Sequence, residues 1–110
     1  MNKLVIAVIQ DKDSAKLMEN LVGKGYRATK LASTGGFLKA GNTTMLIGVR
    51  ADQVEDVVGI IRNTCRSREK MVTTMSPIGG AVESYVPYPV EVIVGGATIF
   101  VVDVERFEHV

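Results

Sequence analysis

The chain has 110 residues and a mass of 11.9 kDa, so residues 1–110 are expected to form one domain. Hydrophobic residues make up 46% and charged residues 23% of the sequence, a composition that excludes a disordered chain. The net charge of +1 argues against a nucleic-acid polymer as partner. No apolar run approaches the ~20 residues of a membrane helix, which argues against membrane insertion.

Side chains for catalysis or metal binding are scarce. Cys65 is the only cysteine, so an internal disulfide is impossible and a cytoplasmic location is expected. The only histidine, His109, is the penultimate residue, and no group of cysteine, histidine and carboxylate side chains has metal-ligand spacing. The sequence therefore predicts a protein that is not an enzyme and has no metal site.

The first half of the chain predicts a strand, a helix and a hairpin. Residues 4–9 are apolar at every position, which is typical of a strand covered on both faces. Residues 11–14 (DKDS) offer helix N-cap side chains, and Gly23 and Gly25 end the helix. Residues 26–31 and 43–49 predict two paired strands. The helix that starts at residues 11–14 is expected to bury an apolar stripe of Ala15, Met18, Leu21 and Val22.

The second half predicts a helix, a long irregular segment and a long strand. Asp52 and Glu55 have the spacing of a capping box, so a helix is expected over residues 52–66. Residues 67–89 hold all three prolines and are expected to be irregular. Residues 90–104 predict one long strand. Gly95 and Gly96 within it either mark a bend or bulge, or allow a ligand or a neighbouring subunit to approach the backbone closely. The helix predicted over residues 52–66 is expected to bury an apolar stripe of Val54, Val57, Val58 and Ile61.

The order of these elements, βαββαβ, predicts an α+β, ferredoxin-like fold. Its two helices can cover only one face of a four-stranded sheet. The first, third and last strands, however, are apolar on both faces. We therefore expect the second face to be buried by other copies of this chain.

Residues 27–44 (RATKLASTGGFLKAGNTT) combine the features of a ligand-binding site. They lie in a stretch without carboxylates, residues 20–51, which carries five basic side chains and would attract an anion. Arg27 suits a phosphate, the Gly35-Gly36 backbone suits an anion, and Phe37 offers a stacking surface. The same glycines also suit plain turns, and no standard nucleotide-binding fingerprint decides between the two interpretations.

Three blocks of the sequence carry a resemblance to a known family: AVIQDKDS, RATKLASTGGFLKAGNTT and PYPVEVIVGGATIFV. Together they resemble the PstA/DarA family, PII-like receptors for the bacterial second messenger cyclic di-AMP. The resemblance spans essentially the whole chain. It implies a PII-like homotrimer with a long loop after the second helix, residues 67–89, and a shorter loop near residues 33–42.

The resemblance also implies where the ligand binds, in clefts between subunits near the base of the shorter loop. Cyclic di-AMP is then the ligand, with no further cofactor, and Asn42 and Thr29 suit an adenine edge. The role of His109 stays open. The ligand-binding residues carried over are Arg27, Ala28, Thr29, Gly36, Phe37, Leu38, Asn42, Gly48 and Phe100.

The leading hypothesis is a receptor that switches loop conformation on binding cyclic di-AMP and thereby signals to an unidentified downstream protein. One alternative is a PII-like trimer that senses a mononucleotide, ATP or ADP, although the sequence shows no strong triphosphate cradle. An RNA-binding ferredoxin-like module is disfavoured because the aromatic motif of that module is absent. A purely structural trimer would leave the clustering of Arg27, Phe37 and Asn42 without a reason.

Overall fold

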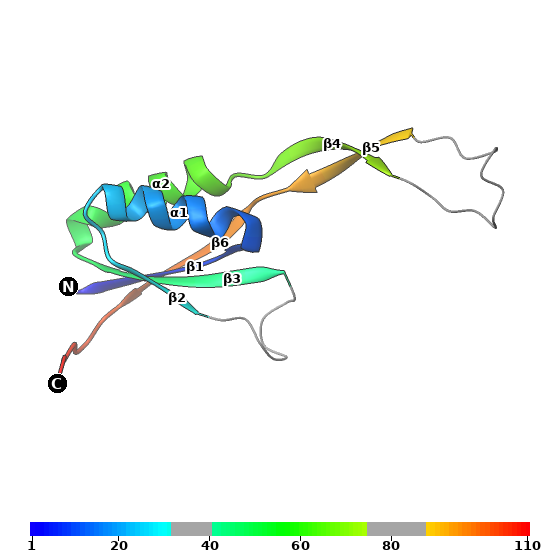
Figure 1. Ribbon diagram of the computed structural model, residues 1–110. Coiled ribbons are helices and arrows are strands. Elements are labelled where there is room, and N and C mark those ends of the chain that lie inside the picture. Colours follow the sequence, from blue (N-terminus) through cyan, green and yellow to red (C-terminus); the bar gives the residue numbers. More distant parts are fainter. Residues whose placement is uncertain (32–40, 75–87) are drawn as a thin grey trace.

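The computed structural model describes residues 1–31, 41–74 and 88–110, and the helices and strands follow one another as Figure 1 shows. One turn of 3-10 helix, Ala51–Gln53, precedes α2. The elements in chain order are β1 (Lys3–Gln10), α1 (Asp11–Gly23), β2 (Ala28–Leu31), β3 (Asn42–Val49), α2 (Val54–Cys65), β4 (Arg68–Thr74), β5 (Tyr88–Val94) and β6 (Ala97–Asp103).

Four of these strands form the main sheet in the order β2-β3-β1-β6, and every neighbouring pair is antiparallel. With two helices, this is a small α+β fold compatible with the predicted ferredoxin-like arrangement. Strand β2 begins at Ala28, two residues later than predicted, because Tyr26 instead donates its backbone N–H to the Leu21 carbonyl and closes the end of α1.

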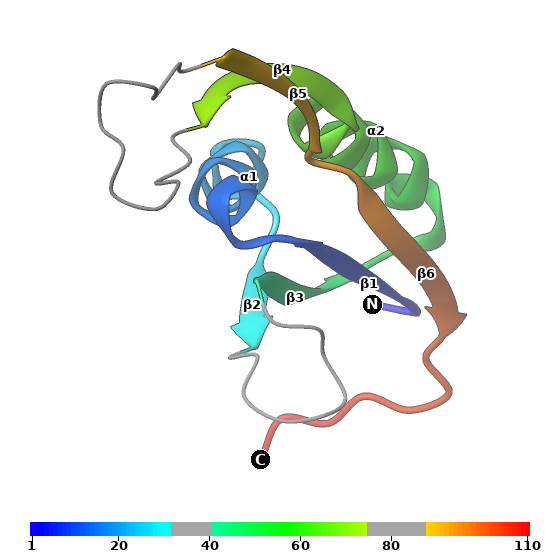
Figure 2. The ribbon, with the colours of Figure 1, turned by 90° about the vertical axis from the view of Figure 1, so that its right-hand side faces the viewer.

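The hydrophobic core lies between the sheet and the two helices, which both cover the same face (Figure 2). Alternate residues of β1 and β3 point into it, as the twofold period of a strand requires. Cys65 belongs to this core. The fully buried side chains are Val5, Ala7, Leu17, Leu21, Met45, Ile47, Val57, Ile61 and Cys65.

Helix α1 differs from the prediction in its start and in its buried face. It begins directly after the extended Gln10, so Asp11–Ser14 form its first turn instead of capping it. Its buried residues are Asp13, Ser14, Leu17 and Leu21, while Ala15 and Val22 are exposed. Ser14 Oγ donates to the Asp11 carbonyl at 2.7 Å, so a polar first turn is accommodated in the interior.

The start of α2 also differs, because the predicted Asp52–Glu55 capping box does not form. The 3-10 turn takes its place: Arg50 N–H donates to Gln53 Oε1, and Gln53 N–H donates to the Arg50 carbonyl, each at 2.9 Å. Asp52 instead pairs with Arg50 Nε at 3.1 Å. The helix buries Val57, Ile61 and Cys65, and Val54 packs against the core.

The sequence predicted that residues 67–89 are irregular, but strands form at both ends of this range. Arg68–Thr74 and Tyr88–Val94 form a separate two-stranded antiparallel ribbon, which projects from the helical layer (Figure 1). Pro89 lies opposite Thr73 in this ribbon. Proline is tolerated there because both strands of a two-stranded sheet are edge strands. The remaining part of that prediction, residues 75–87, lies outside the described residues.

The predicted long strand is likewise two strands that belong to different sheets. Gly95 and Gly96 have φ values of +84° and +95°, which the chain needs to pass from the ribbon to the main sheet. Gly95 also has no room for a side chain, because an added Cβ would lie 2.6 Å from the Arg66 carbonyl oxygen. The glycine pair is therefore a junction between sheets rather than a bulge within a strand.

Candidate functional site

The face of the main sheet opposite the helices, here called the open face, is apolar and is not covered by either helix (Figure 2). Its residues follow from the register, since strand positions that pair across the sheet share a face. Phe100 and Val102 are 52% and 42% exposed there. The apolar members of the open face are Leu4, Ile6, Val8, Leu31, Leu46, Phe100 and Val102.

Three of the predicted ligand-binding residues meet at one end of the open face. Arg27, Thr29 and Gly48 line a hollow of about 440 Å³, called the Arg27 hollow, together with Leu4 and Phe107. Gly48 leaves space there that Met1 occupies, because a Cβ at position 48 would collide with the Met1 sulfur. A cation, a hydroxyl and apolar walls thus face the same space.

Asn42 lies at the opposite end of β3, in a second and larger hollow of about 690 Å³. This Asn42 hollow is bounded by three chain segments: the junction of β1 and α1, the start of β3, and the junction of the ribbon with β6. Its polar lining comes from the side chains of Gln10, Asp11, Lys12, Asn42 and Thr98, and from backbone at Gly41, Gly95 and Gly96. Such a wall can accept a base edge or an anion.

The structure places the other predicted site residues as follows. Ala28 pairs with Ile47 and packs against the core, so its side chain lies on the helix-covered face. Phe100 lies opposite Ile6 in the middle of the open face. Gly36, Phe37 and Leu38 lie outside the described residues. Of the predicted residues that the structure describes, all except Ala28 therefore lie at the two ends or in the centre of the open face.

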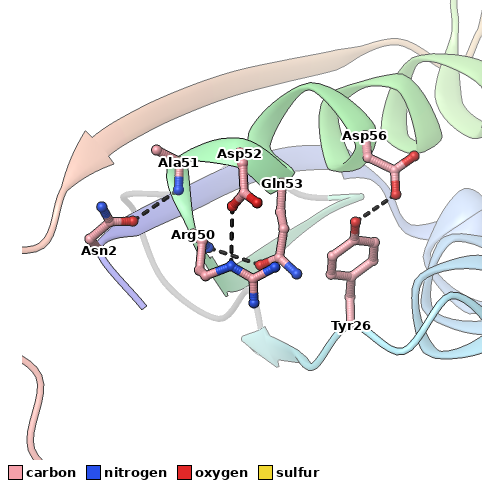
Figure 3. A network of polar contacts seen from close by, with 7 residues as sticks. All are labelled: Asn2, Tyr26, Arg50, Ala51, Asp52, Gln53 and Asp56. Atoms are coloured by element: carbon pink, nitrogen blue, oxygen red, sulfur yellow. Dashed lines mark hydrogen bonds and ion pairs between the residues drawn. The ribbon is translucent and has the colours of Figure 1, made fainter.

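Tyr26 and Asn2, the chain neighbours of Arg27 and Met1 in the lining of the Arg27 hollow, make polar contacts with α2 and the turn before it (Figure 3). Tyr26, directly before Arg27, donates its hydroxyl to Asp56 Oδ2 in α2, which raises the pKa of the Tyr26 phenol above its usual range. Asn2 Oδ1 accepts the backbone N–H of Ala51 at 2.9 Å. These contacts tie the residue before Arg27 to α2, and they tie the N-terminus to the 3-10 turn that precedes α2.

The first turn of α1 joins the segments around the Asn42 hollow. Asp11 N–H donates to the Gly41 carbonyl at 2.9 Å, and Thr43 Oγ1 donates to the Asp11 carboxylate. Asp13 Oδ1 accepts a bond from Arg68 Nη2 at 3.0 Å. One helical turn thus contacts the start of β3 through Asp11 and the base of the ribbon through Asp13.

The thiol of Cys65 is unfavourably placed for covalent chemistry. Burial raises the pKa of the Cys65 thiol to about 11, so the thiolate that a nucleophile needs does not form near neutral pH. Within residues 1–31, 41–74 and 88–110, no three histidine, cysteine or carboxylate side chains gather as a metal site would require. None of the helices in this part of the chain is long and apolar enough to cross a membrane.

Sequence reasoning did not identify Gln10, Lys12 and Phe107 as lining these hollows. The signal for Gln10 was its position at the end of an otherwise apolar strand, directly before the helix. For Gly95 and Gly96, both a bend and a close approach had been considered. The structure shows a junction between two sheets, and it also places both glycines in the wall of the Asn42 hollow.

These features define a small α+β protein whose polar hollows suit ligand binding. The chain matches the model of the cyclic-di-AMP receptor family over residues 2–110, and it belongs to that family. This is a family of binding and signalling proteins. The chain is also similar to a solved structure described as a functionally unknown protein from Pediococcus pentosaceus ATCC 25745, with 41% identity and a TM-score of 0.77. That match covers 99% of this chain and 97% of the other.

Proposed function

We propose that this chain is a non-enzymatic receptor that binds cyclic di-AMP in clefts between the subunits of a PII-like homotrimer. The observation that carries the proposal is the open face, which is mainly apolar along β1 and β6 and has at each end a hollow that contains polar groups. Membership of the cyclic-di-AMP receptor family supports the ligand. The apolar face supports the assembly, because a contiguous exposed apolar sheet is typical of an interface.

The positions of the two hollows favour a site shared by neighbouring subunits. Asn42 and Gly48 are six residues apart on β3, which corresponds to about 20 Å of strand. A compact ligand that contacts both kinds of wall would therefore take the Asn42 hollow from one subunit and the Arg27 hollow from the next. Packing of open faces about a threefold axis would bring such unlike ends together.

Within this site each predicted residue has a role that suits its chemistry. Arg27 would neutralise a phosphate of the cyclic dinucleotide, and Thr29 and Asn42 would hydrogen-bond base edges. Gly48 would admit close approach of a base once the Met1 side chain moves out of the space beside it, and Phe100 would contribute apolar contact from β6. Gly36, Phe37, Leu38 and the backbone of Ala28 complete the proposed set.

The proposed signal is a change in the segments that follow β2 and α2. A ligand in the Asn42 hollow would also reach the base of the β4–β5 ribbon, because Gly95 and Gly96 line that hollow and directly follow β5. A ligand that binds one ribbon position better than another would shift the population towards it. The ribbon would then present or withdraw a surface for a downstream protein.

Calorimetry of the purified protein with cyclic di-AMP, cyclic di-GMP, ATP and AMP tests the ligand. We expect saturable heat with cyclic di-AMP and much weaker binding of the other three. A mononucleotide sensor would instead bind ATP most tightly, yet the cations in the described walls are Lys12 in one hollow and Arg27 in the other. Absence of heat with cyclic di-AMP would overturn the proposal.

A further inference from the structure

Gln10 and Asn42 lie directly opposite one another at the end of the β1–β3 ladder. Side chains of directly opposed residues share a face, with Cβ atoms about 4.5–5.5 Å apart. Both residues are half-buried and both line the Asn42 hollow. The hollow therefore presents two carboxamide groups side by side, of which only Asn42 belongs to the site carried over from the sequence.

The orientation of the Gln10 carboxamide is set by the ribbon junction. Its Oε1 accepts the backbone N–H of Gly95 at 2.8 Å. A carboxamide has one oxygen acceptor and two N–H donors, so this bond leaves the Nε2 donors for another partner. Within the described part of the chain, Nε2 donates to no protein acceptor. Gln10 is thus fixed as a hydrogen-bond donor towards whatever fills the hollow.

The backbone that holds the Gln10 oxygen passes close to Arg68 and to the end of α2. Gly95 adopts φ +84°, and a Cβ there would lie 2.5 Å from Arg68 Nη1. Gly96 N–H in turn donates to the Cys65 carbonyl at the end of α2. The acceptor side of Gln10 is therefore held by a backbone segment that is itself anchored on two sides.

We propose that Gln10 is a second base-reading side chain of the cyclic di-AMP site, which donates from Nε2 to the N7 atom of adenine while Asn42 accepts from the exocyclic amine. This inference rests on the proposed function. An adenine edge offers one acceptor, N7, beside one donor, N6–H, and carboxamides recognise that pair. Because one Gln10 group bonds both the base and Gly95, ligand binding strengthens the tie between the hollow and the base of the ribbon.

Substitution of Gln10 separates its two bonds. Gln10→Glu keeps an acceptor for Gly95 N–H and removes the donor, whereas Gln10→Met removes both without adding charge. We expect both variants to bind cyclic di-AMP about 5- to 150-fold more weakly than the wild type, and Gln10→Glu to keep the wild-type melting temperature. Gln53 provides the matched control, because its Oε1 also accepts a backbone N–H, that of Arg50, outside both hollows. Gln53→Glu and Gln53→Met should bind as the wild type does.

An analogue of the ligand tests the contact itself. Cyclic di-AMP with both N7 atoms replaced by C–H should bind more weakly to the wild type and to the Gln53 variants, with no further loss in Gln10→Met. Wild-type affinity in both Gln10 variants, or an equal loss with the analogue in Gln10→Met, overturns the role of Gln10 alone. If the wild-type protein gives no heat with cyclic di-AMP, it is the proposed function that fails.

Discussion

Arg68 Nη2 donates to Asp13 Oδ1 at 3.0 Å, so the first residue of β4 is held on the first turn of α1. The Asp13 side chain is only 7% exposed, whereas that of Arg68 is 44% exposed. In the described residues, Asp13 Oδ2 is buried without a hydrogen-bond partner, so Arg68 is the main source of compensation for that carboxylate. The ion pair therefore fixes the base of the ribbon against the first turn of α1.

The burial asymmetry of this pair predicts an asymmetric response to mutation. Arg68→Ala leaves a buried carboxylate unpaired and should lower the free energy of unfolding by about 2 kcal/mol, less than a fully buried pair would lose because Arg68 is partly solvated. The Arg68→Ala/Asp13→Ala double variant should be more stable than the sum of the single losses predicts. Urea denaturation measures all three proteins, with Arg62→Ala as an exposed control, and strict additivity would contradict the coupling.

Two glycines of similar sequence context should respond in opposite directions to alanine. Gly95→Ala should lower the free energy of unfolding by about 1–3 kcal/mol or more, because Gly95 has a positive φ and the added Cβ would meet the Arg66 carbonyl. Gly59 lies inside α2 with no atom within 4 Å of an added Cβ, so Gly59→Ala should stabilise by about 0.5–1 kcal/mol. Thermal melts of both variants check this, and a neutral Gly95→Ala would mean that the junction relaxes freely.

The open face predicts which valine of β6 the proposed trimer buries. Val102 pairs with Leu4 on the open face, whereas Val101 pairs with Val5 on the helix-covered face. Val102→Lys should dissociate the assembly, because an unpaired charge in an apolar interface costs several kcal/mol. Val101→Lys should keep it, since this half-exposed position lets the ammonium group reach water. Light scattering decides, and a wild-type mass for Val102→Lys would exclude the open face as the interface.

The proposed adenine contact of Asn42 predicts a loss of affinity without a loss of assembly. Asn42→Ala should weaken cyclic di-AMP binding by ~1–3 kcal/mol, or about 5- to 150-fold, because a hydrogen bond is lost and its partner is stranded. Asn63→Ala is the matched control, as Asn63 is exposed on α2 away from both hollows. Unchanged affinity of Asn42→Ala in calorimetry would mean that Asn42 only starts β3.

Buried Cys65 predicts that stability falls at alkaline pH. The pKa of its thiol is about 11 in the folded protein and near 9 for an exposed thiol, so the native state keeps a proton that the unfolded state releases. The contribution of the protonated Cys65 thiol to the free energy of unfolding is therefore fully present below about pH 9. It is lost as the pH rises towards 11, by about 1.4 kcal/mol per pH unit. Urea denaturation at pH 8.5 and 10 should show this slope in the wild type and a smaller slope in Cys65→Ala. Equal slopes in the two proteins would assign the effect to other groups.

The sequence by itself determined the order of the elements, the core strands and the resemblance that identified the family. Alternating or continuous apolar patterns in residues 4–9 and 43–49 are local signals, and the strands formed there. The same two-sided apolar pattern indicated that one sheet face has no cover within the chain, and both helices do lie on the other face. Such features depend on residue spacing alone, which is why they could be predicted.

Only the tertiary structure decided what residues 67–74 and 88–104 form. Arg68–Thr74 and Tyr88–Val94 pair with each other across thirteen intervening positions, and nothing local in either segment reveals its partner. Without that pairing, the glycines at 95 and 96 suggested a bend in one strand rather than a passage between two sheets. The same holds for Asp13, which resembled a helix cap until the fold brought Arg68 within 3.0 Å. Gln10 and Gly95, 85 positions apart, became neighbours for the same reason: contacts between distant segments arise from the packing of whole elements, which residue spacing does not encode.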